Sequence, residues 1–253
     1  ASATARFLRA ALVSAIRNAA SDVADVTAEI EGRLRLAGRD EPVVVRDSGA
    51  SRTGLLALTG YFRPIALVGL LLSNPFEDVA IESIEYDVRL EYRRKVARVV
   101  GVYLTTEEPR PGDEVAVHVR LAYYGGEERI VTVPVRIPER AAGQKIRIEV
   151  GGGDHIAPVM PEPRNLEDLI ANVKRFYPPQ SLVVGLDVPG EGITLRGRVL
   201  EQLPASAVAA LKPAAGSEQL DAYRAALRQV VPLGHLVTGR ETVRLTVAKR
   251  RER

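Results

Sequence analysis

The chain has 253 residues, of which 46% are hydrophobic, 5% are aromatic and 26% are charged. A chain of this length can bury a sizeable core and form about one to three domains. Its formal net charge of +3 comes from 35 basic and 32 acidic residues that are interspersed, which argues against a nucleic-acid-binding surface. The absence of cysteine excludes disulfides, thiolate zinc sites and a cysteine nucleophile, but it leaves the compartment open.

Residues 1–78 are expected to form an N-terminal unit that packs on a following sheet. Apolar residues at three- and four-residue spacing predict an amphipathic helix over residues 4–20. From residue 26 the period changes to two, because apolar residues alternate with threonine, glutamate and arginine. Residues 26–36 are therefore expected to be a long strand with one solvated face, and residues 42–46 a short partner strand.

The most apolar part of the sequence is at residues 55–72, LLALTGYFRPIALVGLLL. A membrane span needs about 20 predominantly apolar residues. Arg63 and Pro64 lie in the middle of this stretch, where a charge is costly in lipid and proline disfavours an uninterrupted helix. Two short buried helices are therefore expected, with contact to a membrane surface left open.

The clearest pattern is at residues 110–138, where two alternating runs flank a Tyr-Tyr-Gly-Gly segment. This pattern predicts two strands joined by a hairpin turn. Pro134 lacks the N–H that a central strand needs, so the second strand is expected at a sheet edge or with a bulge. Together with strands between residues 79 and 106 and at residues 145–150, the hairpin predicts an immunoglobulin-like sandwich of about seven strands over residues 79–153.

Glycine and proline interrupt the β pattern after residue 150, and residues 154–163 are expected to be a linker. Residues 164–248 are expected to form a small α+β domain that begins with a helix capped by Asn165, and residues 249–253 a basic, solvated tail. Within this domain we expect strands at residues 181–188, 192–200 and 242–247, and helices at residues 204–211 and 217–230. The predicted fold class is therefore mainly β with α: an immunoglobulin-like β-sandwich with packed helices, followed by a small α+β domain.

The sequence contains no complete catalytic, metal-binding or nucleotide-binding motif. His118, His155 and His235 lie apart, and none has metal-ligand or catalytic partners nearby in the sequence. Ser48 lies in an Asp-Ser-Gly-Ala-Ser segment, which differs from the Gly-x-Ser-x-Gly nucleophile turn. The glycine run at residues 151–153 lacks the Lys-Ser/Thr of a P-loop and is more typical of a flexible hinge. We therefore expect no catalytic, cofactor-binding or metal-binding residue in this chain.

The predicted hairpin carries the residues best suited to an interaction. An edge strand can accept a strand from a partner, and exposed tyrosines are common in protein interfaces. The expected contact residues are Tyr123, Tyr124, Pro134 and Arg136.

Several segments together carry a resemblance to a known family. They are VTAEIEGRLRL, LLLSNPFEDVAIESIEYDV, PRPGDEVAVHVRLAYYGGEERIVTVPVRIP, RNLEDLI and LVTGRETVRLTV. Over residues 5–248 the chain resembles the region downstream of the peptidase domain in bacterial SpoIVB-type (S55 family) serine peptidase-domain proteins. The family's catalytic histidine and Gly-Ser-rich nucleophile loop would precede residue 1, so the resemblance assigns no catalytic residue here. A first residue other than Met fits either proteolytic release of this portion or an incomplete chain.

The resemblance implies an exported protein of the periplasm, cell envelope or extracellular space. We expect a non-catalytic protein-interaction or assembly module, whose partner is another protein or its own N-terminal peptidase domain, with oligomerisation left open. One alternative is the C-terminal portion of an S55-type serine peptidase, and another is an accessory subunit of an envelope or membrane-associated complex. No nucleic-acid partner, cofactor or membrane span is expected.

Overall fold

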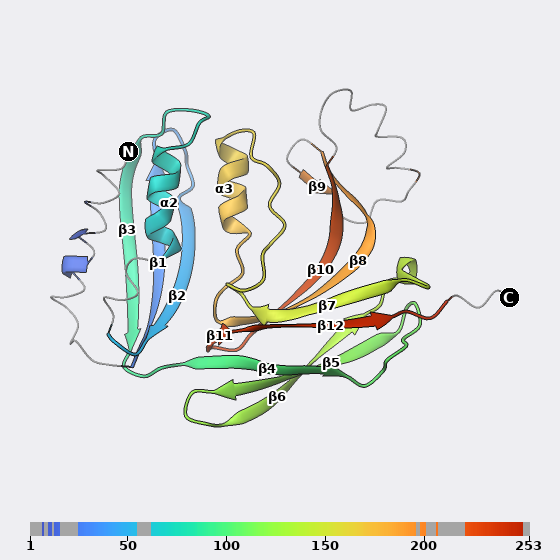
Figure 1. The fold of residues 1–253 in the computed structure, drawn as a ribbon. Helices are drawn as coiled ribbons and strands as arrows, with labels where there is room; N and C mark the ends of the chain where they lie inside the picture. Colours follow the sequence, from blue (N-terminus) through green and yellow to red (C-terminus); the bar gives the residue numbers. More distant parts are fainter. Residues whose placement is uncertain are drawn as a thin grey trace.

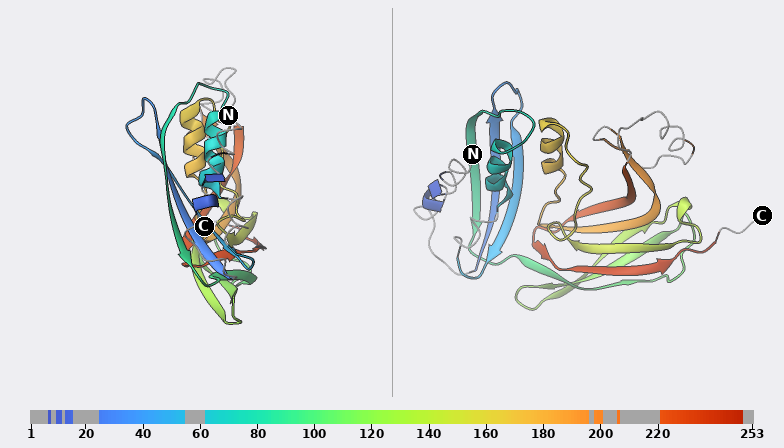
Figure 2. Two further views of the ribbon diagram at one scale, coloured as in Figure 1. Left: turned by 90° about the vertical axis from the view of Figure 1, so that its left-hand side faces the viewer. Right: turned by 45° about the horizontal axis from the view of Figure 1, so that its top comes forward.

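The computed structural model describes residues 7, 10–11, 13–15, 25–54, 62–195, 198–200, 206 and 221–249. In this part of the chain the fold is mainly β, with helices packed beside several sheets (Figure 1). The predicted mainly β class is therefore confirmed. Two further views show a three-stranded sheet with its helices standing beside a larger body of two packed sheets (Figure 2).

The N-terminal sheet is antiparallel, with the strand order β2-β1-β3. It consists of β1 (Val26–Leu36), β2 (Val43–Ser51) and β3 (Ile81–Glu91). The alternation predicted for β1 is present: Ile30 and Leu34 are buried on one face, whereas Arg33 is exposed on the other. β3 corrects the first part of the prediction that residues 79–106 belong to the sandwich, because it pairs with β1 over ten residue pairs. Alternation identifies a strand but does not identify its partner.

Two helices cover the apolar face of this sheet. They are α2 (Arg63–Leu72), which has Pro64 in its first turn, and α3 (Leu166–Lys174). Leu71 of α2 and Ile170 of α3 share one core with Leu34. Among the described residues, no helix has the length and apolar character needed to cross a membrane. The helix expected around Arg63 is confirmed as α2, whereas residues 55–61 lie outside the described residues, as does much of the predicted helix at residues 4–20.

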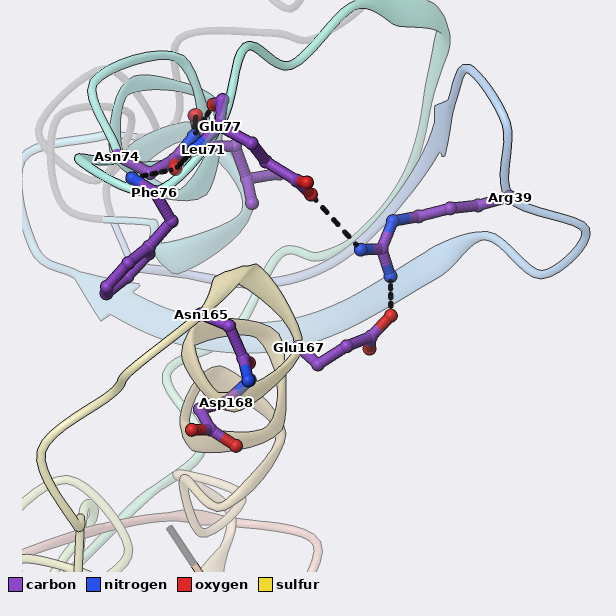
Figure 3. A network of polar contacts seen from close by, with 8 residues as sticks. All are labelled: Arg39, Leu71, Asn74, Phe76, Glu77, Asn165, Glu167 and Asp168. Atoms are coloured by element: carbon purple, nitrogen blue, oxygen red, sulfur yellow. Dashed lines mark hydrogen bonds and ion pairs between the residues drawn. The ribbon is translucent and has the colours of Figure 1, made fainter. Parts of the chain in front are cut away.

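A polar network holds the ends of these helices (Figure 3). Arg39, in the turn between β1 and β2, forms ion pairs with Glu77 beyond α2 at 3.6 Å and with Glu167 in the first turn of α3. Asn165 caps α3 as predicted, because the N–H of Asp168 donates to its Oδ1 at 2.8 Å. The ion pairs connect the turn between β1 and β2 to both helices, while the shared apolar core holds α3 beside α2.

The second part of the molecule, the two-sheet body, is built from two sheets that share one core (Figure 1). The first sheet has the order β11-β4-β5-β6, and the second has the order β10-β8-β7-β12 with β9 paired to β8. Val117 and Leu121 of the first sheet pack with Ile148 and Leu186 of the second. The strands are β4 (Val96–Leu104), β5 (Glu114–Tyr123), β6 (Glu128–Arg136), β7 (Lys145–Gly152), β8 (Ser181–Leu195), β9 (Arg198–Leu200), β10 (Asp221–Pro232), β11 (Leu236–Thr238) and β12 (Arg240–Thr246).

The predicted hairpin is confirmed as β5 and β6. The two strands pair without a register shift, and β6 lies at the end of its sheet, as Pro134 predicted. Gly125 and Gly126 in the turn have φ angles of 105° and 97°, which explains the need for glycine at both positions.

The second sheet differs from the sequence predictions in three ways. β7 pairs with β8 and β12, so the chain on both sides of the expected linker at residues 154–163 belongs to one sheet. β8 continues through residues 189–192, whereas two separate strands were expected at residues 181–188 and 192–200. β10 covers much of the helix predicted at residues 217–230; its apolar spacing is helical, but pairing with β8 overrides this local preference.

Two other predictions for this region have simpler outcomes. The closing strand expected at residues 242–247 is confirmed as β12. Most of the helix expected at residues 204–211, and the basic tail beyond Lys249, lie outside the described residues.

The glycine run at residues 151–153 is a buried crossing point of three segments, which corrects the expectation of a flexible hinge. A Cβ atom on Gly152 would lie 1.8 Å from the Val237 carbonyl oxygen, and one on Gly153 would lie 2.1 Å from the Pro178 carbonyl oxygen. The N–H of Gly153 donates to the carbonyl of Ser181 at 3.1 Å. Glycine is therefore required here because other backbone segments approach too closely for a side chain.

Candidate functional site

The first candidate surface is the outer face, formed by side chains of β4, β5 and β6 that point away from the shared core. Three of these side chains form a row across the sheet, because Tyr103 pairs in register with His118 and His118 with Thr132. The Tyr103 ring stacks on the His118 ring with 5.0 Å between centroids, and His118 Nδ1 lies 2.9 Å from Thr132 Oγ1. The outer face consists of Tyr103, His118, Arg120, Ile130, Thr132, Pro134 and Arg136.

The outer face presents apolar and aromatic area to solvent. Tyr103 is 46% exposed and Ile130 is 55% exposed. Ile130 pairs with Arg120 in the row next to the Tyr103–His118 row, so it lies diagonally beside His118 and two strands away from Tyr103 on the same face. Neighbouring exposed groups of this kind are typical of interaction surfaces, whereas isolated ones are ordinary.

The four residues predicted to make contacts do not share one surface. Pro134 and Arg136 are exposed on the outer face. Tyr123 is partly buried against the shared core and meets His235 edge-on, with 4.9 Å between ring centroids. The Tyr124 hydroxyl donates to Asp25 Oδ2 at 3.0 Å, so this tyrosine joins the two-sheet body to the residue that precedes β1. The tyrosines thus make contacts inside the chain, which their position beside a Gly-Gly turn did not reveal.

The second candidate is a groove of about 390 Å³ between the N-terminal sheet and the segment after α3. Residues 44–48 of β2 form one wall, and residues 173–180 contribute most of the opposite wall. Five consecutive residues of a strand belong to both of its faces. Glu31 of β1 and Arg89 of β3 line the groove as well, so it runs along the edge of β2 and extends over the polar face of the sheet.

Arg63, Asp47 and Asp154 form the polar cluster at one end of this groove. The backbone N–H of Arg63 donates to Asp47 Oδ2 at 2.7 Å, and its Nη2 contacts Asp47 Oδ1 at 3.2 Å and Asp154 Oδ1 at 2.6 Å. The guanidinium also lies 5.0 Å from the centre of the Phe176 ring and donates to the carbonyl of Tyr177. One arginine therefore connects β2, the turn after β7 and the wall of the groove.

The two carboxylates of this cluster are in different environments. Asp47 is buried and also accepts the Ser48 N–H at 2.9 Å. Asp154 is 45% exposed, and desolvation raises the pKa of its carboxyl group although Arg63 lies beside it; repulsion from Asp47 adds to this rise. Arg63 engages both carboxylates, so the cluster is suited to holding the groove in shape.

The candidate nucleophile and the histidines remain separate from one another. Ser48 alternates with Asp47 along β2 and therefore points to the opposite face of the sheet. Its hydroxyl has no hydrogen-bond partner among the described residues. His118 lies on the outer face, His155 in the turn after β7 and His235 before β11. The described residues contain no group of three or more histidine, aspartate or glutamate side chains arranged to hold a metal ion.

A second charged cluster lies on the sheet formed by β7, β8, β10 and β12. Asp187 is contacted by Arg147 Nε at 2.9 Å and by Arg228 Nη1 at 3.2 Å. Arg228 also contacts Glu149 at 3.6 Å, and Arg240 forms a further ion pair with Glu149. Each buried carboxylate therefore has two arginine partners, and the cluster links the strands of this sheet.

Sequence reasoning missed the Arg63 cluster because its members are 16 and 91 positions apart in the chain. The available signal was Arg63 itself, since a lone arginine in an apolar stretch needs a carboxylate partner when it is buried. Compared with known proteins, the chain matches no family model, no curated protein and no solved structure, so the resemblance to SpoIVB-type proteins stays a prediction.

Proposed function

We propose that this chain is a non-catalytic protein-interaction module of an exported bacterial envelope protein. In this proposal its two-sheet body is an immunoglobulin-like sandwich that docks a folded partner protein through the outer face. The observation that carries the proposal is the exposed row of Tyr103 and His118 beside Ile130. The sequence resemblance supports the setting, since proteins of that family are typically exported.

The outer face combines features that make a docking surface specific. Tyr103 is stacked on His118, and the imidazole is in turn within hydrogen-bond distance of Thr132, so the exposed ring is held in place before a partner arrives. A side chain that is already ordered loses less conformational entropy on binding. Arg120 and Arg136 flank this row and supply polar contacts at its border, an arrangement common in protein interfaces.

Docking through the face is favoured over addition of a strand to β6. Pro134 lies within β6, near its C-terminal end, and a proline cannot donate to a partner strand. Glu128, Arg129 and Arg136 are exposed on the same strand. Prolines and charges of this kind protect edge strands from pairing with other chains. The partner is therefore expected to contact side chains of the outer face and not the backbone of β6.

The experiment that tests this proposal is site-specific photo-crosslinking of the full chain in its native host. A photoreactive phenylalanine derivative replaces Tyr103 in one variant and Tyr92 in a matched control. Tyr92 is 53% exposed but lies after β3, away from the outer face. We expect a discrete adduct from position 103 that is absent from position 92 and is lost when Ile130→Asp is added.

Equal adducts from both positions, or none from position 103, would contradict docking through the outer face. Ile130→Asp changes an exposed side chain, so its thermal unfolding curve should match that of the unsubstituted protein and separate lost docking from misfolding. Fractionation of the same cells tests the envelope setting. Finding the protein only in the cytoplasmic fraction would contradict that setting. The mass of the natural protein, compared with its open reading frame, shows whether a peptidase domain precedes the chain.

A further inference from the structure

The second sheet of the two-sheet body has a face that points away from the shared core. Ile146, Ile148 and Leu245 belong to that core, so the residues that alternate with them along β7 and β12 lie on the opposite face. In the described part of this opposite face, the charged residues are Lys145, Arg147, Glu149, Asp187, Arg228, Arg240 and Arg244. Basic residues outnumber acidic ones there, and we call this surface the basic face.

Both acids of the basic face are buried, whereas its arginines reach the solvent. Glu149 is 5% exposed and Asp187 is 7% exposed, and each has two arginine partners. The side chains of Arg147 and Arg240 are 40% and 51% exposed, although each of them contacts one of these acids. The basic face therefore presents positive charge to the solvent and keeps its negative charge inside.

Two arginines of the basic face lie directly opposite each other. Arg244 of β12 pairs in register with Arg147 of β7, and the two strands run side by side (Figure 1). Residues in this position have Cβ atoms about 5 Å apart, and like charges there are destabilising. Lys145 lies two positions before Arg147, so a third positive charge is diagonally beside Arg244. Lys145 and Arg244 are exposed, and no described residue forms an ion pair with either of them.

Exposed acids of the neighbouring segments lie away from these three cations. Glu241 lies on the other side of β12, because side chains alternate along a strand and Glu241 is three positions from Arg244. The acidic residues 107–108 lie in the loop after β4, which is joined to the chain beyond β12 through the Ala248 N–H. Ala248 is four residues beyond Arg244, or about 13 Å along an extended chain. The repulsion between the two arginines is therefore best relieved by an anion from outside the chain.

The groups around Arg244 favour a phosphate group over a carboxylate. The guanidinium fork matches the oxygens of either anion, but a phosphate group carries up to about two negative charges and a carboxylate only one. Three cations meet at this point, so the larger charge is the better match. Thr242 and Thr246 flank Arg244 on the same face and are exposed, so their hydroxyls can donate to further oxygens of the bound group.

We propose that Lys145, Arg147 and Arg244 bind a phosphate group. The phosphate oxygens accept hydrogen bonds from both guanidinium groups and from the Lys145 ammonium group. The bound group lies between Arg147 and Arg244 and so removes their mutual repulsion. Free inorganic phosphate and a phosphate monoester carried by a larger molecule share this chemistry. The site lies on a different sheet from the outer face and is independent of the function proposed above.

The first test measures thermal unfolding of the full chain with sodium phosphate, sodium acetate or sodium chloride at equal ionic strength. A pH of about 8 keeps the phosphate group close to two negative charges. At about ten times its dissociation constant, phosphate should raise the melting temperature by about 3 °C or more relative to chloride. Acetate should raise it clearly less. Glycerol 3-phosphate distinguishes the source: a response as large as that of phosphate indicates a monoester, and a smaller one indicates the free ion.

The second test uses Arg244→Gln, for which the proposal predicts two different effects. In phosphate, the stabilisation should be lost, and the dissociation constant from calorimetry should rise by about tenfold or more because a charged hydrogen-bond partner is missing. In chloride, the melting temperature should stay the same or rise, since the repulsion with Arg147 is removed. Arg35→Gln is the matched control: it removes an exposed arginine of β1, and it should keep the full response to phosphate.

Three results would overturn this proposal. They are equal melting temperatures in phosphate and chloride, equal stabilisation by phosphate and acetate, and a full phosphate response in Arg244→Gln. A fall in the melting temperature of Arg244→Gln in chloride, by several degrees, would show that Arg244 stabilises the fold and would remove the repulsion on which the site rests. None of these results would affect the crosslinking at Tyr103, so the two proposals can fail separately.

Discussion

Strands β6 and β2 each end a sheet, but their edges are presented in opposite ways. The outer edge of β6 pairs with no described strand, and β6 carries Pro134 together with exposed charged side chains. β2 contains no proline between Val43 and Ser51, and its edge lies inside a groove whose far wall is the segment after α3. An exposed edge is protected by its own residues, whereas a recessed edge can keep its backbone groups available because neighbouring segments limit access.

The two edges also depend on different parts of the fold. β6 pairs with β5 through a local hairpin, so its position requires only nearby residues. The groove beside β2 requires three distant segments, which Arg63 and the glycines at residues 151–153 hold together. Perturbations at this junction should therefore alter the β2 groove first and leave the outer face intact.

The largest effect is expected from Gly153→Ala. The added methyl group would lie 2.1 Å from the Pro178 carbonyl oxygen, and backbone cannot move aside as a flexible side chain can. The free energy of unfolding should fall by about 3 kcal/mol or more, as measured by chemical denaturation. Because Pro178 belongs to the groove wall formed by residues 173–180, the shape of the groove should change even where the protein still folds.

Gly101→Ala is the control for this substitution. Gly101 lies in β4, and its nearest neighbour across the new methyl group would be the Arg120 side chain at an ordinary distance of 3.6 Å. Its stability should change by less than about 1 kcal/mol. Equal destabilisation by the two substitutions would contradict the tight crossing at Gly153.

The contrast between the edges explains which parts of the fold could be predicted from the sequence. The β5–β6 hairpin, the Asn165 cap and the strand character of β1 were predictable because each depends on residues that are close in the sequence. The prediction for Pro134 also succeeded, since a missing N–H is a property of one residue. These features are governed by alternation, turn chemistry and capping.

Features that depend on distant partners could not be predicted in this way. β10 has helical spacing but is held as a strand by β8, and β3 has the alternation of any half-buried strand but pairs with β1. Arg63 contacts both Asp47 and Asp154, and no local sequence pattern predicts that these residues lie close together. The glycines at residues 151–153 were ambiguous, because flexibility and close backbone approach both favour glycine.

Asp47→Asn should produce the next largest effect. The change removes the charge from a buried group that accepts hydrogen bonds from the Arg63 backbone, the Arg63 guanidinium and the Ser48 N–H. We expect the free energy of unfolding to fall by about 2 kcal/mol or more, since Arg63 would lose its buried partner. Asp154→Asn is the matched control and should lower the free energy of unfolding clearly less, because Asp154 is half-exposed. If the two substitutions lower the free energy of unfolding equally, the groove does not depend on Asp47 in particular.

A smaller, pH-dependent effect is expected from Asp154. Burial raises the pKa of this carboxyl group in the folded protein, so the folded state holds the proton more tightly than the unfolded state does. Its contribution to stability is fully present below the unfolded-state pKa and is lost as the pH rises through the folded-state pKa. The stability of the natural protein relative to Asp154→Asn should therefore decline over this acidic range and then become constant. Denaturation at several pH values measures this difference, and an increase over the same range would contradict it.

The smallest effect on stability is expected from Pro134→Val, which tests the protection of the β6 edge. β6 pairs with β5 in unbroken register around Pro134, so its nitrogen faces away from β5 and valine would add an outward N–H without disturbing the ladder. The free energy of unfolding should change by less than about 0.5 kcal/mol. The exposed edge would, however, become a better template for pairing, so sedimentation velocity at high protein concentration should show more self-association than for the natural protein. Thr132→Val, which also adds valine to the exposed side of β6 but introduces no new donor, is the control and should remain as monodisperse as the natural protein. Equal self-association of the two variants would attribute the effect to added apolar surface and would remove Pro134 from the protection of this edge.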